Sequence, residues 1–129
     1  MVRGVKHGKL QIPSIIKSNK KLLAIYLSGL YDADGTLPKN PLGAKQLFVD
    51  ITMKDRFFMI QIKEVLKEFG IDSLKIYERH SKSSFCKSGE VSWEVRIRQH
   101  GIILDFLKII GFHHPDKLRR QNELIAMFK

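Results

Sequence analysis

The segment that most constrains this chain runs from Leu27 to Gly35 and reads Leu-Ser-Gly-Leu-Tyr-Asp-Ala-Asp-Gly. Together with the residues before it, this segment has apolar side chains at i, i+4 and i+7 (Leu23, Leu27 and Leu30), a spacing that predicts a helix with one buried face. We expect the helix to span about residues 20 to 34. We expect it to end at Gly35, in the left-handed conformation that glycine adopts most easily.

Two features of this helix are unusual for a helix of a protein core. Gly29 lies in its middle, where glycine costs about 1 kcal/mol relative to alanine. With Ala33 it leaves one helical face almost without side chains, which lets another backbone approach closely. Asp32 and Asp34 stand at the C-terminus, where the helix dipole disfavours carboxylates. These features favour two such helices that cross through Gly29 and Ala33 and carry acids for a cation. A buried helix with an acidic turn is the alternative.

Composition narrows the class of protein. The chain has 129 residues, enough for one domain, and 43% of them are hydrophobic. Its 23 basic residues against 13 acidic ones give a formal net charge of +10, which favours a nucleic-acid partner over a membrane. Cys86 is the single cysteine, so an intramolecular disulfide and a cysteine zinc site are excluded. An intracellular location is expected: the cytoplasm or nucleoid, or an organelle in a eukaryote.

The chain is predicted to consist of a basic arm and one domain. Residues 1–19 are polar and basic and are interrupted by glycines and a proline. They indicate an N-terminal arm that orders on DNA, or a frayed terminus. Residues 20–129 are predicted to form a single domain.

Hydrophobic periodicity predicts the remaining elements of that domain. Alternating apolar residues predict strands at 45–53, 73–79 and 91–98, after a short broken strand that follows Gly35. Helical spacing predicts helices at 55–69 and 102–110 and a last one that begins near Pro115, with Asp55 as an N-cap and Gly70 as a stop. The order is α-β-β-α-β-β-α-α, an α+β fold in which helices cover one face of a four-stranded sheet.

The other face of this sheet carries polar, basic and aromatic side chains. Its outward positions are Gln46, Phe48, Asp50, Thr52, Lys75, Tyr77, Arg96 and Arg98. Strands in the major groove read base edges, and arginine paired with guanine is the commonest specific contact. Together with the net charge, this pattern favours a DNA-binding face over the alternative, a solvated sheet face.

Other chemically active residues are interpreted as structural. The five histidines lack the spacing of metal ligands. Lys117, Arg119 and Arg120 open the last helix and are interpreted as a solvated face, with contact to phosphates as the alternative. The buried face of that helix is expected to contain Leu118, Ile125 and Phe128.

The segment from Leu27 to Gly35 resembles the signature of the LAGLIDADG homing endonucleases and differs from it only at Ser28 and Tyr31. Residues 20–110 follow that family's αββαββα unit. The resemblance implies a four-stranded antiparallel sheet with a concave DNA-binding face and an extra C-terminal helix. It also implies a site-specific endonuclease that cuts a long pseudo-palindromic site in double-stranded DNA. The signature occurs once and intein splicing motifs are absent, so an intron-encoded homodimer is expected.

The resemblance further assigns a metal site at the end of the signature helix. Asp34 matches the family's metal ligand, with Ala33 beside it in the metal site, and Asp32 matches a position that more often stabilises the helix end. The implied cofactor is Mg²⁺, or another divalent cation such as Mn²⁺. The metal ions would activate a water and stabilise the leaving oxygen.

The resemblance also indicates two basic catalytic residues and one departure. Arg98 matches the family's basic residue at the end of the fourth strand. Met53 stands where the family commonly has a polar residue that orders water, and the neighbouring Lys54 is expected to replace it. Because of Met53, an RNA maturase or a non-cleaving DNA-binding regulator on the same fold is the alternative function.

Overall fold

The computed structural model of the protein describes residues 11–72, 75–80 and 91–128. Its elements are α1 (Ser14–Lys17), α2 (Lys20–Asp34), β1 (Gly35–Thr36), the 3-10 helix η1 (Pro41–Gly43), β2 (Val49–Met53), α3 (Arg56–Glu68), β3 (Ile76–His80), β4 (Val91–Ile97), α4 (His100–Ile109) and α5 (Pro115–Met127). The predicted order of helices and strands is confirmed, with α1 and η1 as additions. None of the helices in these ranges has the length and apolar character needed to cross a bilayer.

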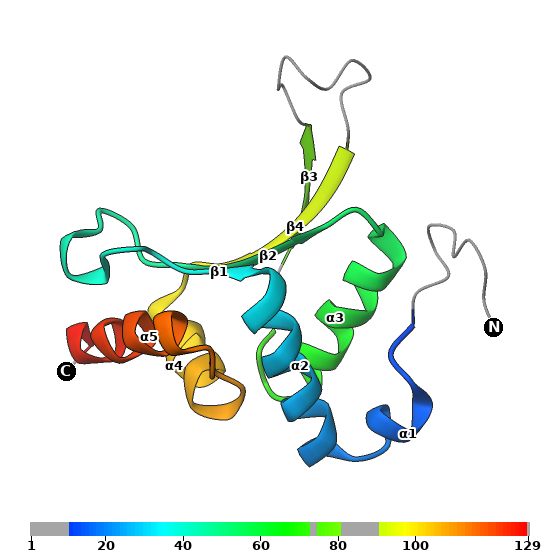
Figure 1. The fold of residues 1–129 in the computed structure, drawn as a ribbon. Helices are drawn as coiled ribbons and strands as arrows, with labels where there is room; N and C mark the ends of the chain where they lie inside the picture. Colours follow the sequence, from blue (N-terminus) through cyan, green and yellow to red (C-terminus); the bar gives the residue numbers. More distant parts are fainter. Residues whose placement is uncertain (1–10, 73–74, 81–90, 129) are drawn as a thin grey trace.

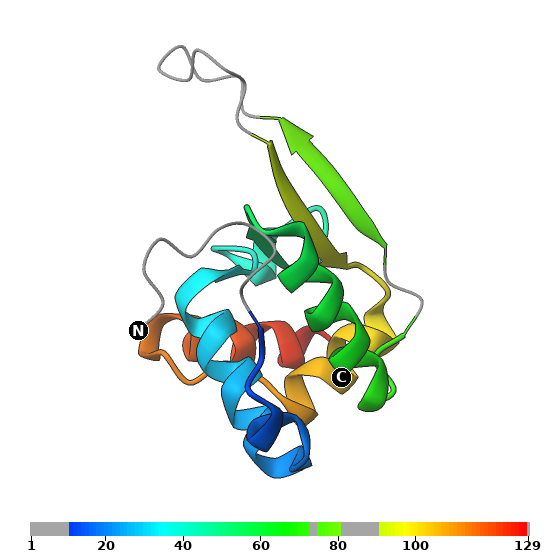
Figure 2. The ribbon, with the colours of Figure 1, turned by 90° about the vertical axis from the view of Figure 1, so that its right-hand side faces the viewer.

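The four strands form an antiparallel sheet in the order β1-β2-β4-β3. Figure 1 shows α2, α3, α4 and α5 on one side of this sheet, and none of the described helices covers the other side. Figure 2, turned by 90°, shows β3 and β4 extending beyond the helices. The predicted α+β architecture with one open sheet face is therefore confirmed.

The core lies between the helices and the inner face of the sheet. Leu23 and Leu27 of α2 are fully buried there, as are Val95 and Ile97 of β4. Burial of a side chain of this size contributes about 1.5–3 kcal/mol relative to leaving it exposed. The helical spacing of α2 and the alternation of β4 thus place the apolar side chains on the predicted faces.

Polar side chains and glycines set the helix ends. The Asn19 side chain accepts hydrogen bonds from the first backbone N–H groups of α2, and Asp55 Oδ1 accepts one from Phe58 N at 3.1 Å. Gly70 and Gly111 follow α3 and α4 with φ of 81° and 65°, values that favour glycine. The predicted roles of Asp55 and Gly70 are confirmed.

The predicted left-handed cap at Gly35 is wrong. Gly35 has φ −78° and ψ 161°, because the chain passes straight from α2 into β1 instead of reversing. A Cβ atom at this position would lie 2.6 Å from the Tyr31 carbonyl oxygen and 2.7 Å from its Cδ2. Glycine is therefore required here for close approach and not for its backbone angles.

Both ends of the chain depart from the predicted details. Residues 1–10 of the predicted arm lie outside the described residues. Cys86, in a loop elsewhere in the chain, also lies outside them. Ile12 is buried in the core, and its N–H donates to Gln61 Oε1 at 3.1 Å, so the described part of the arm packs on the domain. In α5, the fully buried residue is Leu124, whereas Leu118 is exposed. Ile125 and Phe128 are partly buried against the core as expected, and the expected burial of Leu118 is wrong.

Candidate metal site and nucleic-acid interface

Asp34 is the last residue of α2, and its side chain is exposed. Within the described residues no hydrogen bond or ion pair engages its carboxylate. Ala33 beside it is also exposed. The carboxylate oxygens of Asp34 are therefore available to an external cation.

Asp32 has a different role at the same helix end. Its Oδ1 accepts hydrogen bonds from the backbone N–H groups of His113 at 2.9 Å and His114 at 3.1 Å. These residues immediately precede α5. Asp32, at the C-terminal end of α2, therefore accepts hydrogen bonds from backbone N–H groups at the start of α5. This contact supports the helix-end role suggested by the resemblance, and it offsets the unfavourable dipole of α2.

Lys117 completes the link between these two helices. Its Nζ donates to three carbonyl oxygens at the end of α2 and just beyond it, those of Tyr31 at 3.2 Å, Asp32 at 2.7 Å and Gly35 at 2.8 Å. Burial lowers the pKa of Lys117, whereas the nearby carboxylates of Asp32 and Asp34 favour its charged form. Lys117 thus holds a positive charge close to Asp34.

The prediction of a solvated face is wrong for Lys117, because its partners lie more than eighty residues earlier in the chain. One signal was available: Lys117 lies in the first turn of α5, where a helix dipole disfavours a cation. Arg119 does remain exposed, and it pairs with Asp116 and Glu123 along the same helix.

The two departures from the signature are explained by packing. The buried Ser28 Oγ donates to the Gly111 carbonyl at 2.8 Å and lies 2.6 Å from His113 Nδ1. Tyr31 is fully buried, and its ring centroid lies 4.6 Å from that of Phe106 and 6.1 Å from that of Phe112. Both residues join α2 to the segment that precedes α5.

The outer face of α2 carries little side-chain volume. Gly29 is exposed, and a Cβ atom there would meet no atom of the described chain within 4 Å. Leu22 and Ile25 lie on the same stripe and are 43% and 62% exposed. Nothing within the described chain therefore explains why this helix contains a glycine at position 29.

The donor set at the end of α2 suits magnesium better than zinc. No group of three or more His, Cys, Asp or Glu side chains is close enough to hold a metal among the described residues. Mg²⁺ is usually held by one or two carboxylates, with water and substrate phosphates as its other ligands, whereas zinc sites need three or four protein ligands. The single exposed carboxylate of Asp34 fits the first pattern.

The strand register decides which predicted catalytic residues lie near Asp34. Gly35 pairs with Ile51, so Asp34 lies toward the Met53 end of β2, and Lys54 follows at that end. Ile97 pairs with Val49, so Arg98 lies beyond the opposite end of β2. The structure therefore brings Lys54 and Asp34 to one end of β2 and separates Arg98 from them. The reason is that β4 runs antiparallel to β2.

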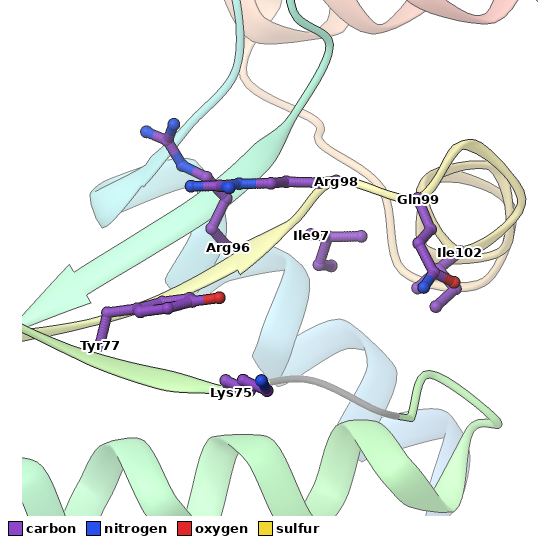
Figure 3. Close-up of a pocket in the computed structure, with 7 residues that line it drawn as sticks. All are labelled: Lys75, Tyr77, Arg96, Ile97, Arg98, Gln99 and Ile102. Atoms are coloured by element: carbon purple, nitrogen blue, oxygen red, sulfur yellow. The ribbon is translucent and has the colours of Figure 1, made fainter.

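The predicted DNA-contacting side chains differ in exposure. Gln46, Thr52, Lys75, Tyr77 and Arg98 are exposed, Phe48 and Arg96 are partly buried, and Asp50 is buried. Arg98 lies over Tyr77, with its guanidinium carbon 5.9 Å from the ring centroid. Figure 3 shows Lys75, Tyr77, Arg96 and Arg98 around a shallow hollow of about 150 Å³. This corner of the sheet presents positive charge and an aromatic ring.

A buried charge cluster occupies the centre of the same face; we call Asp50, Glu94 and Arg96 the sheet triad. Arg96 donates through Nε and Nη2 to Asp50 Oδ2 at 3.1 and 2.8 Å, and its Nη2 lies 3.4 Å from Glu94 Oε2. Burial and a hydrogen bond to Glu94 raise the pKa of Asp50 to about 6. That hydrogen bond lowers the pKa of Glu94. Asp50 therefore lacks the exposure expected of a direct DNA contact.

Comparisons with known proteins agree with this geometry. A family model described as a LAGLIDADG-like domain matches residues 21–111. The homing endonuclease I-ApeI of Aeropyrum pernix is 27% identical over 115 residues, which cover 88% of this chain and 46% of that protein.

A solved structure shows the same fold. The group I intron-encoded homing endonuclease I-CeuI complexed with DNA matches with a TM-score of 0.54 and 16% identity, over 92% of this chain and 56% of that one. The present chain spans about half the length of both proteins.

Proposed function

Because the chain belongs to the family of LAGLIDADG-like domains, we propose that it is a site-specific endonuclease that cuts double-stranded DNA by metal-dependent phosphodiester hydrolysis. The observation that carries this proposal is the exposed carboxylate of Asp34 at the end of the signature helix, which has no hydrogen bond or ion pair within the described part of the chain and lies beside an open basic sheet face. The similarity to I-ApeI and I-CeuI supports the same activity.

Asp34 is the residue that would hold the metal. Mg²⁺ fits best, and Mn²⁺ has similar ligand preferences. When bound, the metal supplies an activated water and stabilises the leaving oxygen. The protein itself positions the metal ligand: the contacts of Asp32 and Lys117 fix the end of α2 and so hold the Asp34 carboxylate in place.

Lys117 and Lys54 are the basic residues that the structure associates with this end of α2. The ammonium group of Lys117 interacts electrostatically with the carboxylates of Asp32 and Asp34. Lys54 directly follows β2, at the end of that strand nearer to Asp34. A cation fixed beside a scissile phosphate stabilises developing negative charge. We assign this role to Lys117 and Lys54, and a DNA-contacting role to Arg98.

Two copies of the signature helix would complete the site. The stripe formed by Leu22, Ile25, Gly29 and Ala33 is exposed on α2 and is apolar or nearly without side chains. A second α2 packed there would bury Leu22 and Ile25 and account for Gly29. The two Asp34 carboxylates would then lie near one axis, which matches a pseudo-palindromic DNA site.

Substitution of Gly29 tests this pairing. Gly29→Leu is expected to abolish the dimer in light scattering, because a large side chain would separate the helices. Gly29→Ala is the control for folding. It should raise the stability of the isolated helix by up to about 1 kcal/mol, since a Cβ has open space there within the described chain. A stable dimer of Gly29→Leu would contradict the pairing through this stripe.

The cleavage experiment uses the purified protein, Mg²⁺ and a plasmid library that carries randomised duplex inserts. Discrete double-strand cuts within a subset of inserts are expected, and a chelator should abolish them. Binding to defined inserts without cleavage in any divalent cation would contradict the nuclease proposal.

Binding without cleavage would support the alternative function, an RNA maturase or a DNA-binding regulator. One structural observation favours this alternative. Met53 is partly buried against the core, and its thioether is a poor partner for a metal-bound water. Selective binding to structured RNA would identify the maturase, and binding to DNA alone would identify the regulator.

A further inference from the structure

Arg96 is held in one orientation by three neighbours on the open sheet face. Asp50 Oδ2 accepts hydrogen bonds from its Nε and Nη2, and Glu94 Oε2 lies 3.4 Å from the same Nη2. The guanidinium carbon lies 4.3 Å from the ring centroid of Phe48, which fixes the plane of the group. Arg96 therefore loses little side-chain entropy on binding a ligand.

The charges around Arg96 make it a poor phosphate contact. Asp50 and Glu94 have side chains only 7% and 6% exposed and face the same guanidinium. Arg79 adds a second cation, with Nη1 3.2 Å from Glu94 Oε1. Two carboxylates and two guanidinium groups carry no formal net charge when all are ionised. Affinity for phosphates depends on net positive charge, which this cluster does not supply.

The donors that remain on Arg96 define what it can recognise. Nε and Nη2 are directed at carboxylates, which leaves the Nη1 hydrogens without a partner in the described chain. The side chain of Arg96 is 22% exposed, so a ligand can reach it. In the major groove, guanine presents two acceptors, N7 and O6, whereas adenine presents a donor beside its acceptor.

We propose that Arg96 recognises a guanine in the target site and that Asp50 and Glu94 are positioning residues that do not touch DNA. This proposal rests on the proposed function, since it assumes that the open sheet face binds double-stranded DNA. It assigns specificity to the sheet triad and non-specific attraction to exposed cations such as Arg98.

The test measures binding separately from cleavage. Wild type and variants each select bound duplexes from a pool with a randomised centre, in the presence of a chelator. Arg96→Lys keeps the charge but loses the planar fork. The double variant Asp50→Asn/Glu94→Gln keeps the shapes of the side chains but removes the charges that orient Arg96. Arg119→Lys is the matched control, because Arg119 is exposed on α5, away from the sheet face, and pairs with Asp116 and Glu123. Thermal unfolding verifies that every variant is folded.

Wild type should select a guanine at one position of the site. Arg96→Lys should reduce that preference about tenfold or more, as expected for one specific base contact. The double variant should also weaken it while binding random-sequence DNA more tightly, because negative charge has been removed. Arg119→Lys should leave the preference unchanged.

Three outcomes overturn the proposal. One is a guanine preference that survives in both Arg96→Lys and the double variant. Another is a double variant that binds all sequences equally more weakly, which is the result of a purely structural role. The third is a wild type that selects no sequence, which would also contradict the proposed function. A wild type that selects the guanine but never cuts DNA supports this inference and contradicts only the nuclease.

Discussion

The end of α2 (Asp32, Asp34 and Lys117) and the sheet triad each combine two acids with one base, but the base contacts different partners. At the end of α2, Lys117 donates to main-chain carbonyls and leaves the carboxylate of Asp34 exposed. At the centre of the sheet, Arg96 binds the carboxylates themselves, and both acids are buried. The first arrangement keeps an anion available to an external cation, whereas the second neutralises its anions internally.

This contrast shows that the number of acids at a location does not define its function. Because a carboxylate must be largely free to coordinate a hard cation, only the end of α2 suits a metal. Buried carboxylates need partners to offset their desolvation, and they orient the partner in return. The contacts of the neighbouring base therefore distinguish the two locations.

The largest expected effect comes from removing the exposed charge. Asp34→Asn should lower the cleavage rate in Mg²⁺ by several orders of magnitude, since the metal lowers most of the barrier. Binding to target DNA without metal should be at least as tight as in wild type. The control is Asp32→Asn, which should instead cost about 0.5–2 kcal/mol of stability, as loss of a helix cap does. Near wild-type cleavage by Asp34→Asn would contradict the site assignment.

Replacement of Arg96, the basic residue of the sheet triad, should have the next largest effect. Arg96→Ala should lower the free energy of unfolding by about 3 kcal/mol at pH 8, because it leaves the buried Asp50 carboxylate without its cation and Glu94 with Arg79 alone. The loss should be smaller at pH 5, where Asp50 can bind a proton. Denaturant unfolding at the two pH values measures both.

Arg98→Ala is the control for Arg96→Ala, because Arg98 is exposed and forms no hydrogen bond or ion pair with a buried acid among the described residues. Its stability should change by less than about 0.5 kcal/mol, while the salt dependence of DNA binding should fall by about one unit of slope if it contacts a phosphate. Equal destabilisation by both substitutions would remove the contrast between these arginines.

A smaller loss of stability is expected when Lys117, the basic residue at the end of α2, is replaced. Lys117→Met keeps most of the aliphatic chain but removes three hydrogen bonds to carbonyls. Stability should fall by about 1–2 kcal/mol, as expected for under-satisfied acceptors at a partly exposed site. Cleavage should fall more than metal-free DNA binding does, because Asp34 is held less firmly. Thermal unfolding and gel-shift binding separate these effects, and unchanged cleavage would contradict the role given to Lys117.

The smallest effect is a pH dependence of stability that comes from Asp50. Its pKa is raised from 3.8 to about 6, so the folded state binds this proton more tightly than the unfolded state does. The associated stabilisation is full below the unfolded pKa and is lost as the pH rises through about 6. Glu94, with a lowered pKa, acts in the opposite direction at lower pH. Relative to Asp50→Asn, wild type should therefore lose stability between about pH 4 and 6, and parallel curves for the two proteins would contradict this prediction.

Local patterns in the sequence were sufficient to predict the elements and the faces they bury. The spacing of Leu23 and Leu27 predicted α2, and the alternation of Val95 and Ile97 predicted β4, because helix and strand periodicities differ. The place of Asp34 at the C-terminal end of α2 was predicted in the same way. These features depend on neighbours a few residues apart.

The missing parts of the site depend on contacts between distant segments. The carbonyls bound by Lys117 and the carboxylate bound by Arg96 are 82 to 86 and 46 residues away in the chain, respectively. Strand register, which no local pattern specifies, separates Arg98 from Asp34. The conflicts of Lys117 and Asp32 with the dipoles of their own helices were local signs of such contacts.

The link between Lys117 and the end of α2 has a consequence for the timing of synthesis. Domains fold as the chain emerges, at about 5–20 residues per second. The Gly35 carbonyl is made 82 residues before its partner Lys117, so several seconds pass in which the end of the signature helix lacks this support. A ribosome-bound chain would thus hold the Asp34 carboxylate on a frayed helix end until α5 has been translated and has docked.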